Sequence, residues 1–252
     1  MKNKTLWCLS AVAVVLGVLA YFSSSGSKAS SPRLNGKAVF PGLDVSAIAS
    51  VDVGGKQLLV SGEKGWTVAS LYGYPADRGK IAENFLKLVE LKVGQVVRGR
   101  PLDGKKDVVL KDSSGKVVAS VSCGEKHSKW GRGRYAAFEG QTVLLSDALD
   151  AFDGDAKAWV DTKIVDTPYI NFSSVVDPAA DSSLFGFSTG TVVKVTVAGD
   201  TNRVATIGGT VAGGTDRYFK LDGSAWVYTV AQYSVESLLP KPKTTAESEE
   251  KK

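Results

Sequence analysis

The chain has 252 residues, of which 43% are hydrophobic and 23% charged, and its formal net charge is +5. This composition is ordinary for a globular protein and excludes a chain that is largely disordered or a long coiled coil. Three lysines before position 30 account for +3, and four lysines against three glutamates after Pro240 account for +1. The body between them is nearly neutral, so it lacks the concentrated basic face of a nucleic-acid-binding protein.

An uncharged apolar run opens the chain from Thr5 to Phe22, over 18 residues. As a helix it would be about 27 Å long, close to the thickness of the hydrocarbon core of a bilayer. Trp7 and Tyr21 lie near its two ends, where interfacial aromatic residues are common. We therefore predict a transmembrane anchor over residues 1–22. A cleaved signal peptide is the alternative, because small residues suited to cleavage follow between Ser23 and Ala29.

The charges that flank this run give a weak orientation signal. Two lysines precede it and three basic residues follow it closely, so the positive-inside count is nearly a tie. A short N-terminal tail ahead of a large body normally stays inside. We predict a single-pass protein of the cytoplasmic (inner) membrane, with the bulk of the chain extracytoplasmic, in the periplasm. Cys8 lies inside the apolar run, which disfavours a lipoprotein.

Polar segments bound the body of the chain. Residues 23–37 are rich in Ser, Gly and Lys and predict a flexible stalk, while residues 240–252 predict a disordered, solvated tail. After the stalk, short alternating apolar runs separated by glycine turns predict strands. The first such runs are Ile48–Val53, Lys56–Ser61 and Trp66–Ala69.

One helix is expected next. Asp77 supplies a start signal and Gly94 a stop signal, and between them apolar residues recur at helical spacing. These positions are Ile81, Phe85, Leu88, Val89 and Val93. The pattern predicts a helix over residues 77–93.

Strands resume after the helix, and their order is repeated later in the chain. The predicted runs are Asp107–Lys111, Lys116–Ser122, Arg134–Phe138 and Thr142–Leu145, followed by Lys194–Val197, Arg203–Ile207, Arg217-Tyr218 and Val227-Tyr228, with a short helix over Gln232–Leu239. Each set contains an Arg-Tyr pair, an acid-Gly turn and an aliphatic strand in the same order. A duplicated β-rich unit explains this common register.

The expected fold class is α+β and β-rich. Duplicated antiparallel β-sheet units would carry one main helix packed on the first unit, in addition to the N-terminal transmembrane helix. The first unit is predicted over residues 38–158 and a second, shortened unit over residues 159–239. The second unit has no evident counterpart of the 77–93 helix.

Several motifs run through the body in a fixed order. Leu43-Asp44 opens it, Gly65-Trp66 precedes the Tyr74–Asp77 segment and the helix, the Arg-Tyr strand and glycine turn follow, and Trp159 opens the second unit. With the anchor, this ordered set resembles domain-of-unknown-function family 4340 of bacterial envelope proteins, over roughly residues 38–239. The resemblance implies an envelope protein that is often encoded near gliding-motility-type ABC transporters. It implies no catalytic residues.

The loop that precedes the Arg134 strand is the best candidate for binding. It concentrates basic side chains around one tryptophan, whereas the matching loop 208–216 of the second unit has no lysine or arginine. The candidate ligand- or partner-binding residues are Lys126, Lys129, Trp130, Arg132 and Arg134. Cations around an aromatic ring suit anionic lipid headgroups, phosphorylated glycans or an acidic partner. A solvated hairpin loop is the alternative.

The cysteines and the single histidine offer little for catalysis. Cys8 and Cys123 are expected to be free thiols, because one lies in the apolar run and the other deep in the body. Cys123 and His127 could form a nucleophile pair only if imidazole activates the thiol. A strand-end cysteine and a loop histidine are the simpler interpretation, so we expect no catalytic residues and no cofactor.

Acidic and aromatic groups have structural explanations as well. The acids Asp147, Asp150, Asp153 and Asp155 resemble a calcium loop, but Ile164 stands where the closing glutamate is needed. Helix capping and a solvated face explain them, and no metal is expected. The tryptophans Trp66, Trp159 and Trp226 lie on strand patterns, which favours core packing over a sugar-binding platform.

The leading hypothesis is a membrane-anchored, non-enzymatic accessory or scaffold subunit for an ABC-type export or motility assembly. Its partners would be the membrane, through the N-terminal helix, and a membrane or envelope protein, with no nucleic acid; the oligomeric state is left open. The alternative is an envelope ligand-binding module for cell-wall or surface glycan. An enzyme built on Cys123 and His127 is a third hypothesis.

Overall fold

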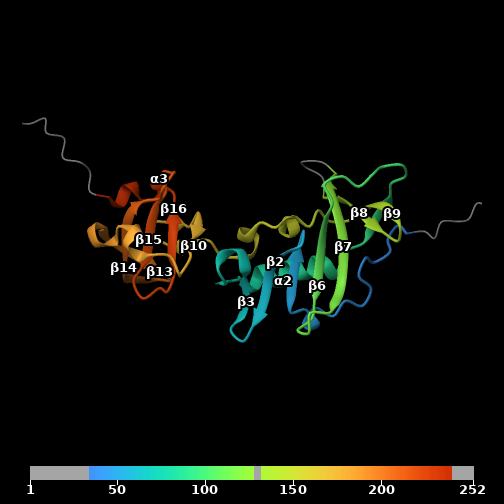
Figure 1. The fold of residues 1–252 in the computed structure, drawn as a ribbon, viewed down its shortest axis with the longest axis horizontal. Coiled ribbons are helices and arrows are strands. Elements are labelled where there is room, and N and C mark those ends of the chain that lie inside the picture. The colour runs from blue at the N-terminus through green and yellow to red at the C-terminus, as the bar shows by residue number, and fades with distance from the viewer. Residues whose placement is uncertain (1–33, 128–131, 240–252) are drawn as a thin grey trace, which may run out of the picture.

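A computed structural model describes residues 34–127 and 132–239. They form a nine-stranded sheet, a five-stranded sheet and a two-stranded hairpin (Figure 1). All strand pairs are antiparallel within these sheets, which confirms the β-rich, antiparallel class predicted from the short alternating runs. The predicted anchor over 1–22 and tail over 240–252 lie outside the described residues. Within the described part of the chain, no helix has the length and apolar character needed to cross a membrane.

The nine-stranded sheet contains all the strands predicted for the first half of the body. In order across the sheet its strands are β4 (Tyr74–Pro75), β3 (Gly65–Val68), β2 (Lys56–Gly62), β1 (Ser50–Val53), β6 (Lys106–Lys111), β7 (Val117–Lys126), β8 (Arg134–Phe138), β9 (Gln141–Leu145) and β5 (Val93–Val96). Gly54 and Gly55 join β1 to β2 with φ of 56° and 78°. Positive φ at both central residues is what a tight two-residue hairpin turn requires, and glycine adopts it without strain.

Helix α2 (Arg78–Val89) covers one face of this sheet and lies behind β2 and β6 in Figure 1. The side chain of Asp77 accepts a hydrogen bond from the backbone N–H of Lys80 at 2.8 Å, which caps the first turn. Ile81, Phe85 and Leu88 recur at helical spacing and are buried in the core. The predicted start of the helix and the burial of these three positions are therefore confirmed, whereas Val89 of the predicted stripe is 40% exposed.

The end of the helix is predicted four residues too late. The prediction runs to Val93, but α2 ends at Val89 and Val93 is the first residue of β5. The backbone N–H of Val93 donates to the carbonyl of Lys37, and Val93 pairs with Leu145 of β9. A β-branched apolar residue fits either pattern, so these long-range backbone partners decide its conformation.

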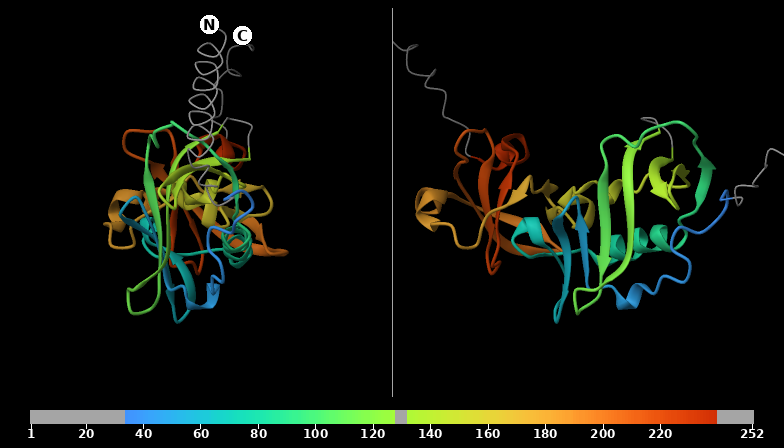
Figure 2. Two further views of the ribbon diagram at one scale, coloured as in Figure 1. Left: turned by 90° about the vertical axis from the view of Figure 1, so that its right-hand side faces the viewer. Right: turned by 45° about the vertical axis from the view of Figure 1, so that its right-hand side comes forward.

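The five-stranded sheet forms a second lobe, shown beside the first in Figure 2. In order across the sheet its strands are β12 (Ser174–Val175), β16 (Val227–Val230), β15 (Arg217–Leu221), β14 (Asp200–Thr210) and β13 (Thr191–Val197). The hairpin of β10 (Lys163–Val165) and β11 (Ile170–Asn171) precedes it, and α3 (Gln232–Val235) follows it. The short 3₁₀ helices of the described residues are η1 (Val45–Ala47), η2 (Ala69–Leu71), η3 (Asp150–Asp153), η4 (Ala156–Trp159), η5 (Ser182–Phe185), η6 (Phe187–Thr189) and η7 (Glu236–Leu238).

Each sheet contains a four-stranded meander of consecutive strands, β6–β9 in the first and β13–β16 in the second. Arg134 begins the third strand of one meander and Arg217 begins the third strand of the other. The matched positions of the sequence thus occupy matched places in the two meanders. Duplication as the origin of this match remains a prediction.

Two predicted boundaries are corrected by the packing. Trp159 was expected to open the second unit, but it is fully buried and its ring lies 6.3 Å from Phe85 of α2, centroid to centroid. By these contacts it belongs to the first lobe. The stalk was expected to extend to residue 37, but Leu34 is buried and the backbone N–H of Gly36 donates to the carbonyl of Val93 at 2.7 Å. The fold therefore includes the chain from Leu34 onward.

An aromatic cluster joins the two lobes. The Tyr74 ring of β4 lies 5.4 Å from Phe172 and 5.2 Å from Trp226, both from the second lobe. Phe172 in turn stacks on Tyr228 of β16. Burial, together with a hydrogen bond to Tyr228, raises the pKa of Tyr74 above its usual value, so its hydroxyl stays neutral.

Candidate functional site

The predicted binding loop connects the end of β7 to the start of β8. Lys126 is the last residue of β7 and Arg134 the first residue of β8, while Arg132 is exposed in the loop. Lys129 and Trp130 lie outside the described residues. The structure therefore describes three of the five predicted binding residues.

Two of these cations are bound to acids of η3. The Lys126 ammonium lies 2.5 Å from Asp150 Oδ1 and 2.8 Å from Asp153 Oδ2. The Arg134 guanidinium pairs with the other carboxylate oxygen of Asp153. The Arg134 side chain is only 7% exposed, and its Nε is buried without a hydrogen-bond partner in the structure. We call Lys126, Arg134, Asp150 and Asp153 the ion-pair cluster.

Electrostatics in the ion-pair cluster favour the charged forms of Asp153 and Lys126. Partial burial favours the neutral form of Asp153, but the hydrogen bonds and charges of Lys126 and Arg134 outweigh it and hold the pKa of Asp153 below its usual value. The hydrogen bonds that the Lys126 ammonium donates to Asp150 and to Asp153 raise the pKa of Lys126. Lys126 and Arg134 thus hold η3 against the ends of β7 and β8. Arg132 is the described cation of the loop with no ion pair to another described residue.

Cys123 and His127 do not form a nucleophile pair in this arrangement. Cys123 is buried on β7, and burial, partly offset by Arg134, raises the pKa of its thiol to about 11. Such a thiol is almost entirely protonated near neutral pH and is a poor nucleophile. The His127 Nδ1 atom lies 2.7 Å from the Tyr135 hydroxyl, within hydrogen-bond distance. The Arg100 guanidinium stacks 3.9 Å from the centroid of the same Tyr135 ring.

The acids that resembled a calcium loop have separate structural partners. The carboxylate of Asp147 accepts from the N–H of Leu149 at 2.7 Å, and that of Asp155 accepts from the N–H of Lys157 at 2.9 Å at the start of η4. Asp150 and Asp153 belong to the ion-pair cluster. Among residues 34–127 and 132–239, no group of three or more potential ligands is placed to hold a metal ion.

A groove along the outer side of α2 is a second candidate site, which the sequence did not indicate. It encloses about 380 Å³. Its apolar walls include Val45, Trp66, Ile81, Phe85, Leu86 and Val89. Among the described residues that line it, Arg78 alone is charged. We call this surface the α2 groove.

Exposed aliphatic side chains form one wall of the α2 groove. Leu86 is 54% exposed and Val89 is 40% exposed, although both lie on a helix whose other face is buried. The Trp66 ring packs edge-on against Phe85, with 5.3 Å between the ring centroids. Trp66 therefore packs against the core, as predicted, and also lines the groove. A partner could bury these side chains without moving the core.

One sequence signal could have indicated the α2 groove. Leu86 and Val89 follow Phe85 and Leu88 by one residue each, so the apolar stripe is wider than one buried face requires. The ion-pair cluster had no such signal, because its cations and acids are separated by a loop and a hairpin. Searches of protein-family models, of curated proteins and of solved structures each found no match to this chain.

Proposed function

We propose that this chain is a membrane-tethered, extracytoplasmic accessory or scaffold protein that binds a subunit of an ABC-type export or motility assembly. The α2 groove is the observation that carries the proposal, because it is an apolar surface open to a partner. The uncharged run from Thr5 to Phe22 supports the tether. The resemblance to family 4340 supports the class of partner.

The shape and charge of the α2 groove suit one kind of occupant. An amphipathic helix could place aliphatic side chains spaced by three and four residues against Leu86, Val89 and Trp66. An acidic residue at the end of that helix would face Arg78, the charged group at the rim. We therefore assign the groove to an acidic, amphipathic helix of the partner subunit.

The path of the chain past the end of α2 supports the proposed tether. The described chain begins at Leu34, and its next residues bond to the segment that follows α2: the N–H of Val39 donates to the carbonyl of Leu91 at 2.9 Å. Residues 23–33 of the proposed stalk connect this point to the proposed anchor. The end of α2 would thus lie within one extended stalk length of the bilayer, within reach of a neighbouring membrane subunit.

A matched pair of leucine variants tests this assignment. The full chain is purified from detergent-solubilised membranes as the parent, as Leu86→Glu and as Leu184→Glu, and the retained proteins are identified. Leu184 is 71% exposed in the second lobe and outside the groove, so it controls for a charge added at an exposed leucine.

We expect the parent and Leu184→Glu to retain export or motility subunits, and Leu86→Glu to lose them. A glutamate in the groove would have to be desolvated against apolar walls, which is unfavourable. If the parent retains no such subunit, or if Leu86→Glu retains the same ones, the assignment is wrong.

A further inference from the structure

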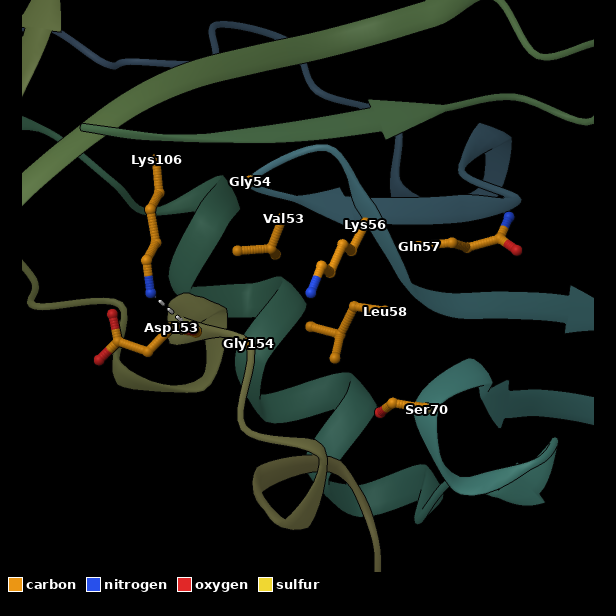
Figure 3. A pocket seen from close by; sticks show the side chains of 9 residues that line it. All are labelled: Val53, Gly54, Lys56, Gln57, Leu58, Ser70, Lys106, Asp153 and Gly154. Atoms are coloured by element: carbon orange, nitrogen blue, oxygen red, sulfur yellow. Dashed lines mark hydrogen bonds between the residues drawn. The ribbon is translucent and has the colours of Figure 1, made fainter. Parts of the chain in front are cut away.

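A second cavity opens at the hairpin of β1 and β2, with a volume of about 310 Å³ (Figure 3). Lys56, Lys106, Ser70, Val53 and Leu58 are among the residues that line it. We propose that this cavity, the lysine pocket, binds the phosphate group of a small organic phosphate between Lys56 and Lys106. The inference is independent of the partner proposed above, because the two cavities share no lining residue.

Strand register explains why two lysines meet here. Val53 pairs with Lys56 across the glycine turn and with Val108 of β6 on its other side. Lys106 lies two residues before Val108 on β6. Its side chain therefore lies on the same face of the sheet as that of Val108, which is the face that packs on the core. Figure 3 shows both lysine side chains extending from their strands toward Asp153 and Gly154.

The charge of the lysine pocket is not neutralised by its own carboxylate. Among the described residues, neither Lys56 nor Lys106 forms an ion pair. The Lys106 ammonium donates to the backbone carbonyl of Asp153 at 3.3 Å. The two carboxylate oxygens of Asp153, which also lines the pocket, bind Arg134 and Lys126. The one acid that lines the pocket is thus already paired with two cations of the ion-pair cluster.

The remaining groups fit a phosphate monoester. Lysine ammonium groups bind phosphate as compact point charges, and the Ser70 hydroxyl adds a neutral donor at the opposite side. Val53 and Leu58 form an apolar wall for the organic part of the ligand. The volume is at the lower end of the range for small-molecule sites, which suits a ligand of roughly ten non-hydrogen atoms. Two lysines that only extend their ammonium groups into water are the alternative.

Calorimetric titration of the full chain in non-ionic detergent tests the proposal, with phenyl phosphate and inorganic phosphate as the two probes. We expect saturable binding of both, tighter for phenyl phosphate because its ring contacts Val53 and Leu58. Lys56→Gln and Lys106→Gln should each raise the Kd about tenfold, since each removes one charged hydrogen bond. Added salt should weaken the binding as well, because both lysines are exposed.

Lys64→Gln is the matched control. Lys64 is exposed in the turn between β2 and β3 and does not line the pocket, so its loss changes the net charge equally. Its Kd should equal that of the parent. The proposal is overturned if neither probe saturates at millimolar concentration, if Lys64→Gln weakens binding as much as Lys56→Gln, or if the two probes bind equally. None of these results depends on recovery of a partner subunit.

Discussion

Removal of the Asp153 carboxylate tests whether the ion-pair cluster stabilises the first lobe. In Asp153→Ala the guanidinium of Arg134, which is 7% exposed, loses its carboxylate partner and stays buried with its charge. Breaking a fully buried pair costs 3–5 kcal/mol, and since Asp153 is itself 32% exposed we expect about 3 kcal/mol. Lys126→Ala removes a cation that is 39% exposed and should cost less than about 1 kcal/mol.

Urea unfolding followed by tryptophan fluorescence measures these changes. Trp159 is a suitable reporter, because its indole N–H donates to the carbonyl of Ala151 in η3 at 2.9 Å. The double variant Arg134→Met/Asp153→Leu removes both charges and should recover most of the loss. A loss below about 0.5 kcal/mol in Asp153→Ala, or a double variant as unstable as the single one, would refute the reasoning from an uncompensated buried charge.

Three further predictions follow from single groups. The pKa of Asp153 is lowered in the folded state. Its ionised form therefore contributes stability at neutral pH, and this contribution is lost as the pH falls through that pKa. In unfolding experiments, the difference in stability between the parent and Asp153→Asn should shrink below about pH 4. Because the pKa of Cys123 is about 11, only about one thiol in a thousand is ionised at pH 8, and peptide mapping after iodoacetamide treatment should find Cys123 unmodified until urea unfolds the chain. A methyl group at Gly208 would collide with a carbonyl oxygen of η5, whereas one at Gly209 would lie 3.6 Å from it, so Gly208→Ala should lower the midpoint of thermal unfolding and Gly209→Ala should not.

The local pattern of apolar and capping residues was sufficient to predict most of the strands and the main helix. Alternating apolar residues predict β1, β2 and β6 because a strand with one buried face repeats every two residues. Asp77 and the buried stripe after it predict the start of α2 because capping acts within one turn. These features need only neighbours along the chain.

Long-range pairing decided the features that local pattern left ambiguous. Val93 fits a helical stripe and a strand equally, and its bonds to Lys37 and Leu145 place it in β5. Leu34 looks like part of a polar stalk, but it is buried, and the N–H of nearby Gly36 donates to the carbonyl of Val93. Such partners are distant in sequence, so no local window contains them.

The candidate sites also combine features that are visible in the sequence with features that depend on the tertiary structure. The sequence by itself determined that basic residues gather between β7 and β8, because residue type and spacing are local. Only the tertiary structure decided that Lys126 and Arg134 bind the acids of η3, that Lys56 and Lys106 line one pocket, and that Leu86 remains exposed. Charge neutralisation and burial depend on which segments approach in space, and for this chain those segments are separated by whole strands and loops.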